Sequence, residues 1–187
     1  MPKKQSSASK RLRNDGNRRR AELFALLLGP LLFCACAGYQ LGPTNGVVAG
    51  SKSIQVNLFQ NTTIEPRLTE PVATALRRTI QQDGTYRLST KGNADIIVEG
   101  AITEFDRSGV TFDPRDILTV RDYELRMTAT FTAKETATGR VLLSSTESGR
   151  TTIRAGSDLP SAERQASPLL ALDLAQRITA ALVDGSW

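Results

Sequence analysis

The sequence predicts an α+β domain, a two-layer sandwich in which two helices cover one face of a four- to five-stranded, mainly antiparallel or mixed sheet. The first observation is a pair of segments whose apolar residues recur every three to four positions, as on one side of a helix. The second is a set of segments in which apolar and polar residues alternate, as in half-buried strands. The third is their order, β, α, β, β, β, β, α. Strands that cluster between two amphipathic helices are typical of an α+β fold.

The first strand is expected at residues 53–59 (SIQVNLF), where Ile54, Val56 and Leu58 share one face. The polar residues 60–63 predict a turn. A helix is expected from there to about Gln82, with Thr69 as a candidate N-cap and Gly84 just beyond its end. Its apolar stripe consists of Leu68, Val72, Ala75, Leu76 and Ile80.

The middle of the chain predicts four more strands. A short one is expected at residues 86–89 and longer ones at 94–105, 118–134 and 141–153, with 106–115 as a loop. Thr138-Gly139 predicts a hairpin turn, and Gly149 is a candidate β-bulge. The final helix is expected at residues 161–183, where Pro168 starts the main part of the helix or kinks it.

The positive charge of the chain is confined to its beginning. Residues 1–35 hold eight Lys and Arg residues against two acids, whereas residues 36–187 hold 16 against 17. A folded part without excess positive charge argues against binding to nucleic acid. Residues 23–35 are almost wholly apolar, but a helix that spans a bilayer needs about 20 such residues. We therefore interpret 1–35 as a signal peptide, 36–52 as a Gly-rich tether and 53–187 as a single α+β domain.

The signal peptide ends in a sequence that resembles a bacterial lipobox, Phe33-Cys34-Ala35-Cys36. Cys36 follows the small Ala35 and is the candidate for acylation, whereas Cys34 follows the bulky Phe33. An acylated Cys36 would anchor the chain in a membrane, at about 0.8 kcal/mol per buried CH2 group. Ala37 after the cysteine favours the outer membrane, by resemblance to enterobacterial sorting. The alternatives are a plain signal peptide and a twin-arginine signal at Arg18-Arg19-Arg20.

No pattern in the sequence indicates catalysis, and we predict that the protein is not an enzyme. The chain contains no His, which removes the commonest general base and metal ligand. The acidic residues around 106–122 lack the order of a calcium-binding loop, so we expect no metal and no cofactor. An envelope hydrolase that uses Glu104 and Asp106 remains the weakest hypothesis.

Four short segments together resemble the LptE family of lipopolysaccharide-assembly lipoproteins, over nearly all of residues 36–187. They are Cys36-Ala37-Gly38-Tyr39-Gln40-Leu41; residues 54–62 (IQVNLFQNT); Ile64-Glu65-Pro66 before a helix with Ala75-Leu76-Arg77-Arg78; and Asp158-Leu159-Pro160 before a helix ending in residues 178–182 (ITAAL). The order and spacing of the segments carry the resemblance.

This resemblance implies a non-catalytic lipoprotein of the outer membrane that lies partly inside the LptD β-barrel and assists lipopolysaccharide transport. Lipopolysaccharide is anionic, so arginine contacts are expected. The candidates are Arg77 and Arg78 on the first helix, and Arg121 and Arg126 on the longest strand. The alternative is a lipid-anchored periplasmic adaptor or binding module for another envelope complex.

Overall fold

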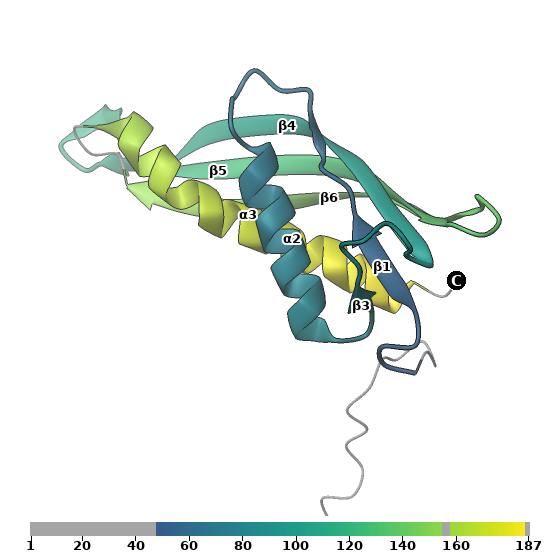
Figure 1. The fold of residues 1–187 in the computed structure, drawn as a ribbon. Helices are drawn as coiled ribbons and strands as arrows, with labels where there is room; N and C mark the ends of the chain where they lie inside the picture. Colours follow the sequence, from purple (N-terminus) through teal and green to yellow (C-terminus); the bar gives the residue numbers. More distant parts are fainter. Residues whose placement is uncertain (1–47, 155–157, 186–187) are drawn as a thin grey trace, which may run out of the picture. The chain divides into compact units, whose positions relative to one another are not determined.

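The computed structural model describes residues 48–154 and 158–185, so the predicted signal peptide, Cys36 and most of the tether lie outside the described residues. Two helices lie on the same face of one mixed sheet (Figure 1). The sheet has the strand order β3-β1-β4-β5-β6, and a sixth, short strand, β2, pairs with β4. The predicted α+β architecture, with both helices on one face, is therefore confirmed.

The sheet has a parallel and an antiparallel part. In the parallel part, β1 pairs with β3 and with β4, and β2 also pairs with β4. In the antiparallel part, β4, β5 and β6 form two successive hairpins. The strands are β1 (Ser53–Val56), β2 (Gln60–Asn61), β3 (Arg87–Leu88), β4 (Ile96–Asp113), β5 (Asp116–Glu135) and β6 (Val141–Arg154), and the helices are α2 (Thr69–Asp83) and α3 (Leu159–Asp184).

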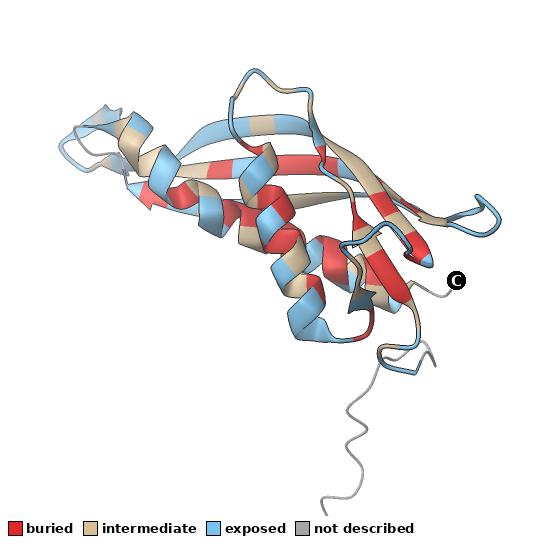
Figure 2. Ribbon diagram, in the orientation of Figure 1, coloured by how far each residue is buried: buried red, intermediate tan, exposed pale blue. Residues whose placement is uncertain are grey.

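The core lies between the sheet and the two helices, where the buried faces meet (Figure 2). The predicted stripe of α2 is buried, and the helix ends at Gly84, which has a φ of 77° and donates its N–H to the Ile80 carbonyl at 3.2 Å. The predicted cap is wrong, because Leu68 is the N-cap and makes no side-chain capping bond, so that Thr69 is already helical. Packing of the stripe therefore stabilises the start of α2 more than a cap does.

The alternation of the first strand stops earlier than predicted. Leu58 is 56% exposed, whereas Phe59 is 1% exposed. The reason is Gly100 on β4: a Cβ there would lie 2.7 Å from Cε2 of the Phe59 ring, so the ring occupies the space that the glycine leaves. The next residues, Gln60 and Asn61, form β2 instead of the predicted turn.

The predicted loop at 106–115 is a continuation of β4. This strand runs to Asp113 and pairs with β5 as far as Asp116, so that only two residues form the turn. Here the hairpin is exposed on both faces: Phe112 is 50% and Leu118 87% exposed. A strand without a buried face needs no apolar–polar alternation, which explains why the sequence pattern fails here.

The last helix is longer than predicted and packs close to β6. Asp158 caps α3 by accepting the Ser161 N–H at 3.2 Å, and Pro168 lies inside the helix without starting it. Gly149 is not a bulge, since it pairs in register with Met127. Instead, a Cβ at this position would lie 2.6 Å from the backbone nitrogen of Leu174 on α3. The missing side chain therefore lets the helix backbone approach the strand.

Among the described helices, α3 alone has the length and composition to cross a membrane, with 26 residues and a mean hydropathy of 1.2. One stripe of its large apolar side chains packs into the domain, whereas Leu169 is exposed. Leu170, Leu174, Ile178 and Leu182 are all fully buried. These contacts make α3 the central helix of the core in this fold.

Candidate functional site

Neither described helix covers the second face of the sheet, which we call the open face. On β5, the odd-numbered residues from Leu125 to Ala133 are buried toward the helices, so the even-numbered residues face the other side. Hydroxyl side chains dominate this face in successive cross-strand pairs of β5 and β6. The pairs are Thr128–Ser148, Thr130–Thr146 and Thr132–Ser144.

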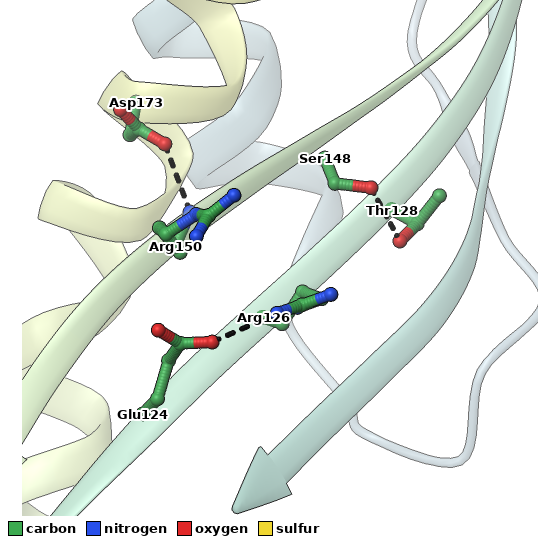
Figure 3. A network of polar contacts seen from close by, with 6 residues as sticks. All are labelled: Glu124, Arg126, Thr128, Ser148, Arg150 and Asp173. Atoms are coloured by element: carbon green, nitrogen blue, oxygen red, sulfur yellow. Dashed lines mark hydrogen bonds and ion pairs between the residues drawn. The ribbon is translucent and has the colours of Figure 1, made fainter. Parts of the chain in front are cut away.

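The next pair along the same two strands places Arg126 directly opposite Arg150. The backbone N–H of Arg150 donates to Oδ2 of Asp173 on α3 at 2.8 Å and so points away from β5. The two arginines therefore form a non-hydrogen-bonded pair, in which the Cα atoms are about 4.5 Å apart. Figure 3 shows them side by side on neighbouring strands.

The two guanidinium groups differ in their partners. Nη2 of Arg126 lies 3.0 Å from Oε1 of Glu124, in an ion pair whose arginine side chain is 49% exposed. The guanidinium of Arg150 has no ion pair or hydrogen bond among the residues that the structure describes. In the adjacent pair, Oγ1 of Thr128 and Oγ of Ser148 are 2.9 Å apart (Figure 3). The free guanidinium of Arg150, with two hydroxyl groups beside it, is the part of this surface that can donate to an anion such as a phosphate.

The other end of the open face carries a neutral polar network. Nζ of Lys134 donates to Oε2 of Glu99 at 2.8 Å, and Nδ2 of Asn57 donates to the other oxygen of Glu99 at 3.3 Å. The hydrogen bond from Lys134, followed by its charge, holds the pKa of Glu99 below the usual value. Nε2 of Gln55 donates to Asn57 at 2.8 Å.

The arginine end of the open face also carries acids, because on β4 Asp106 lies opposite Arg126 and Glu104 lies opposite Thr128. The two carboxylates considered for a hydrolase therefore lie beside Arg126, and Arg150 is the cation of this group without an ion pair to a described residue.

The four arginines singled out from the sequence do not converge on one site. Arg126 lies on the open face, while Arg121 is exposed near the turn between β4 and β5. Arg77 and Arg78 belong to α2, which lies on the opposite side of the sheet. Nη2 of Arg77 is 3.5 Å from the Val56 carbonyl, and Arg78 is exposed.

Arg150 was missed because the segment 141–153 alternates weakly, although a signal was available. The hairpin turns at Thr138-Gly139, and Arg126 and Arg150 each lie 12 residues from Thr138. Reflecting the sequence about this turn would have placed the two arginines opposite each other. Within the described residues, no group of three or more His, Cys, Asp or Glu side chains could hold a metal ion.

Comparison with known families gives one decisive match. A family model named LptE, described as lipopolysaccharide-assembly, matches residues 51–182. The chain belongs to the LptE family. Members of this family are non-enzymatic components of lipopolysaccharide transport, so this chain has a general role in lipopolysaccharide assembly.

Solved structures agree with the fold of this LptE-family chain. A protein from Xanthomonas campestris has a TM-score of 0.54 and 9% identity, covering 77% of this chain and 90% of that protein. A protein from Chlamydia trachomatis also has a TM-score of 0.54 and 9% identity, covering 74% of this chain and 98% of that protein. No curated protein matches the chain. At these identities the structural likeness supports the fold alone.

Proposed function

We propose that this chain is an outer-membrane lipoprotein, anchored through Cys36, that acts as plug and partner of an LptD-type β-barrel and assists lipopolysaccharide transport to the cell surface. Membership of the LptE family supports the general role. The observation that carries the specific proposal is the open face, a broad hydroxyl-rich surface on one side of a well-packed domain.

The open face has the chemistry of a surface that packs inside a barrel. The interior of a transmembrane β-barrel is polar, unlike the outer surface that meets lipid. Hydroxyl groups such as those of Thr130 and Thr146 can both donate and accept hydrogen bonds to a polar wall. Burial of unpaired charges would be costly, so the part of this face expected to meet the wall is the row of hydroxyl pairs between the Lys134–Glu99 ion pair and the charged residues around Arg126. The open face is therefore the side that we expect to face the barrel.

Within this face, Arg126 and Arg150 are the proposed contact for phosphate groups of lipopolysaccharide. Both guanidinium groups lie on the same surface, beside the Thr128–Ser148 hydroxyl pair. Of the candidates from the sequence, Arg77, Arg78 and Arg121 lie elsewhere, so the proposal depends on Arg126 and on the newly found Arg150.

A bulky substitution on the open face tests the barrel contact. We expect Thr130→Trp to reduce copurification with the barrel at least tenfold, because the indole would separate the two surfaces. Thr74→Trp is the matched control, since Thr74 is equally an exposed threonine but lies on α2. If Thr130→Trp retains the barrel as well as the control does, the open face does not meet it. Recovery of a different envelope complex with the wild-type chain would instead favour an adaptor role.

The phosphate contact has its own test in cells depleted of the natural chain. Arg126→Ala combined with Arg150→Ala should lower surface lipopolysaccharide while the barrel still copurifies. Arg78→Ala, which removes an exposed cation on the helix side, should leave surface lipopolysaccharide unchanged. Normal surface lipopolysaccharide in the double variant would contradict the assignment. The anchor is tested separately, because Cys36→Ser should release the chain from membranes.

A further inference from the structure

A groove on the helix side of the sheet is not used by the function proposed above. It has a volume of about 670 Å³ and lies between the loop that precedes α2, the first half of α3, and the middle of β4 and β5. Four proline rings form much of its lining, together with four apolar side chains at its base. These residues are Pro66, Pro71, Pro160 and Pro168, with Leu68, Phe105, Leu125 and Leu170.

The polar lining residues are Glu65, Arg67, Glu163, Arg164 and Ser167, and the rest of the lining offers few partners to a polar occupant. Proline has no backbone N–H, and Leu68, Leu125 and Leu170 are at most 3% exposed at the base. A peptide in this groove would leave many of its own N–H and C=O groups without hydrogen bonds, which is unfavourable. An alkyl chain carries no such groups. The groove is therefore better suited to an acyl chain than to a peptide segment.

Two exposed apolar side chains are neighbours of lining residues in the sequence. Ile64 is 103% exposed and directly precedes the lining residue Glu65, while Leu169 is 61% exposed and directly follows Pro168.

The rim carries two cations that no carboxylate neutralises within ion-pair distance. Among the lining residues, Glu163 forms an ion pair with Arg107, which lies outside the lining. The charged lining residues without an ion pair are then one acid, Glu65, and two cations, Arg67 and Arg164. Nη2 of Arg164 donates to the Ser161 hydroxyl at 2.7 Å, and no ion pair of Arg67 or Arg164 is formed with the described residues. The charge of Arg164 also helps, after the hydrogen bonds from Ser161, to lower the pKa of Asp158. The charges around the groove therefore nearly balance, and a contact with an anionic head group depends on the two guanidinium groups that no ion pair occupies.

Arg67 is also strained. It is the one non-glycine residue in the described part of the chain with a positive φ, at 65°. Residues held in this region are commonly found at ligand sites, because the surrounding structure must compensate for the strain. Here the strained position belongs to a cation on the rim of the groove.

We propose that this groove binds one acyl chain of lipopolysaccharide, with a phosphate of its lipid part held between Arg67 and Arg164. The proposal rests on the proposed function, because it takes lipopolysaccharide as the ligand. It goes beyond that function by assigning the acyl part of the ligand to the helix side, away from the Arg126–Arg150 pair on the open face.

The test is photo-crosslinking in living cells with the full-length chain. A photoreactive benzoylphenylalanine replaces Ser167, which lines the groove, or Gln165, an exposed residue of the same helix outside the lining. We expect at least tenfold more lipopolysaccharide adduct from position 167 than from position 165. Introducing Arg67→Gly should lower the yield at 167 several-fold without lowering the melting temperature, because glycine adopts a positive φ freely.

The outcomes separate this inference from the function on which it rests. Equal yields at 167 and 165, with strong adducts from a probe at Thr130 on the open face, would overturn the groove and leave the proposed function intact. An adduct at 167 that mass spectrometry identifies as phospholipid would overturn lipopolysaccharide as the occupant. No lipopolysaccharide adduct from any of the three positions would overturn both.

Discussion

Replacement of Gly149 by alanine is the sharpest test of how the helix layer meets the sheet. The added Cβ would lie 2.6 Å from the backbone nitrogen of Leu174, 2.7 Å from its Cβ and 2.8 Å from its Cα. To reach 3.4 Å, the shortest ordinary contact, strand and helix must separate by 0.8 Å (3.4 − 2.6). Overpacking of a core costs about 1–3 kcal/mol, and we expect about 3 kcal/mol because the obstacle is helix backbone.

Urea denaturation followed by circular dichroism measures this loss. For a domain of this size, about 3 kcal/mol corresponds to a fall of about 10 °C in melting temperature. Ser144→Ala on the same strand should stay within about 0.5 kcal/mol of the natural chain, because Ser144 is exposed. Adding Leu174→Ala should not relieve the Gly149→Ala clash, since the nitrogen and Cα of residue 174 remain. A loss below about 0.5 kcal/mol for Gly149→Ala would refute the reasoning.

Three further predictions concern single contacts. Phe59→Ala should destabilise the domain by about 3–5 kcal/mol in a urea titration, because the ring is 1% exposed and fills the space above Gly100. Asp95→Asn should cost stability at neutral pH but progressively less as the pH falls below about 4, because hydrogen bonds from the Ser53 hydroxyl and N–H lower the pKa of Asp95 from its usual 3.8. Melting temperatures of both chains over a pH series would show this. A difference in melting temperature between the natural chain and the variant that grows in acid would contradict it. Arg150→Thr should raise the free energy of unfolding by about 0.2–1 kcal/mol, since it removes a like charge from a cross-strand pair, and an equal stability in calorimetry would show that the pair costs nothing.

The pH prediction follows from the sign of the shift. A carboxyl group whose pKa is lower in the folded state stabilises the fold above its unfolded pKa, and this stabilisation is lost as the pH falls through the folded value. For Asp95 the stabilising bonds to Ser53 measure 2.6 and 2.7 Å. Asparagine at this position has no such ionised state, so the natural chain loses its advantage in acid.

The parts of the fold that the sequence could predict are those with one buried and one exposed face. The stripe of α2 and the alternation of β5 each reflect a single apolar contact surface, so their periodicity identified them correctly. The tip of the β4–β5 hairpin has no buried face, and its polar residues resembled a loop. The shift from Leu58 to Phe59 depends on Gly100, some forty residues away in the sequence, and no local pattern could show it.

The candidate site was predictable only in part for a related reason. Arg126 lies on the strand with the clearest alternation and was found as an outward-facing cation. Arg150 lies on β6, whose inward positions include Gly149, Glu147 and Ser145 instead of large apolar residues. Leu143 and Ile153 give this inward face apolar side chains only near its ends, and its middle is shaped by the close approach of α3, so the strand gave little signal.

The cross-strand pairs of β5 and β6 show why the two arginines stand apart from an ordinary polar surface. Three successive pairs on the open face oppose two hydroxyl residues, and in the first of them, Thr128–Ser148, the hydroxyls are 2.9 Å apart. The next pair opposes two cations, a like-charge contact that is unfavourable in a sheet and that Glu124 and Asp106 beside Arg126 offset in part. An anion that bridges both guanidinium groups reverses the sign of this interaction, because each cation then gains a charge-assisted hydrogen bond. Stability of the free domain and affinity for a phosphate should therefore change in opposite directions when Arg150 is replaced.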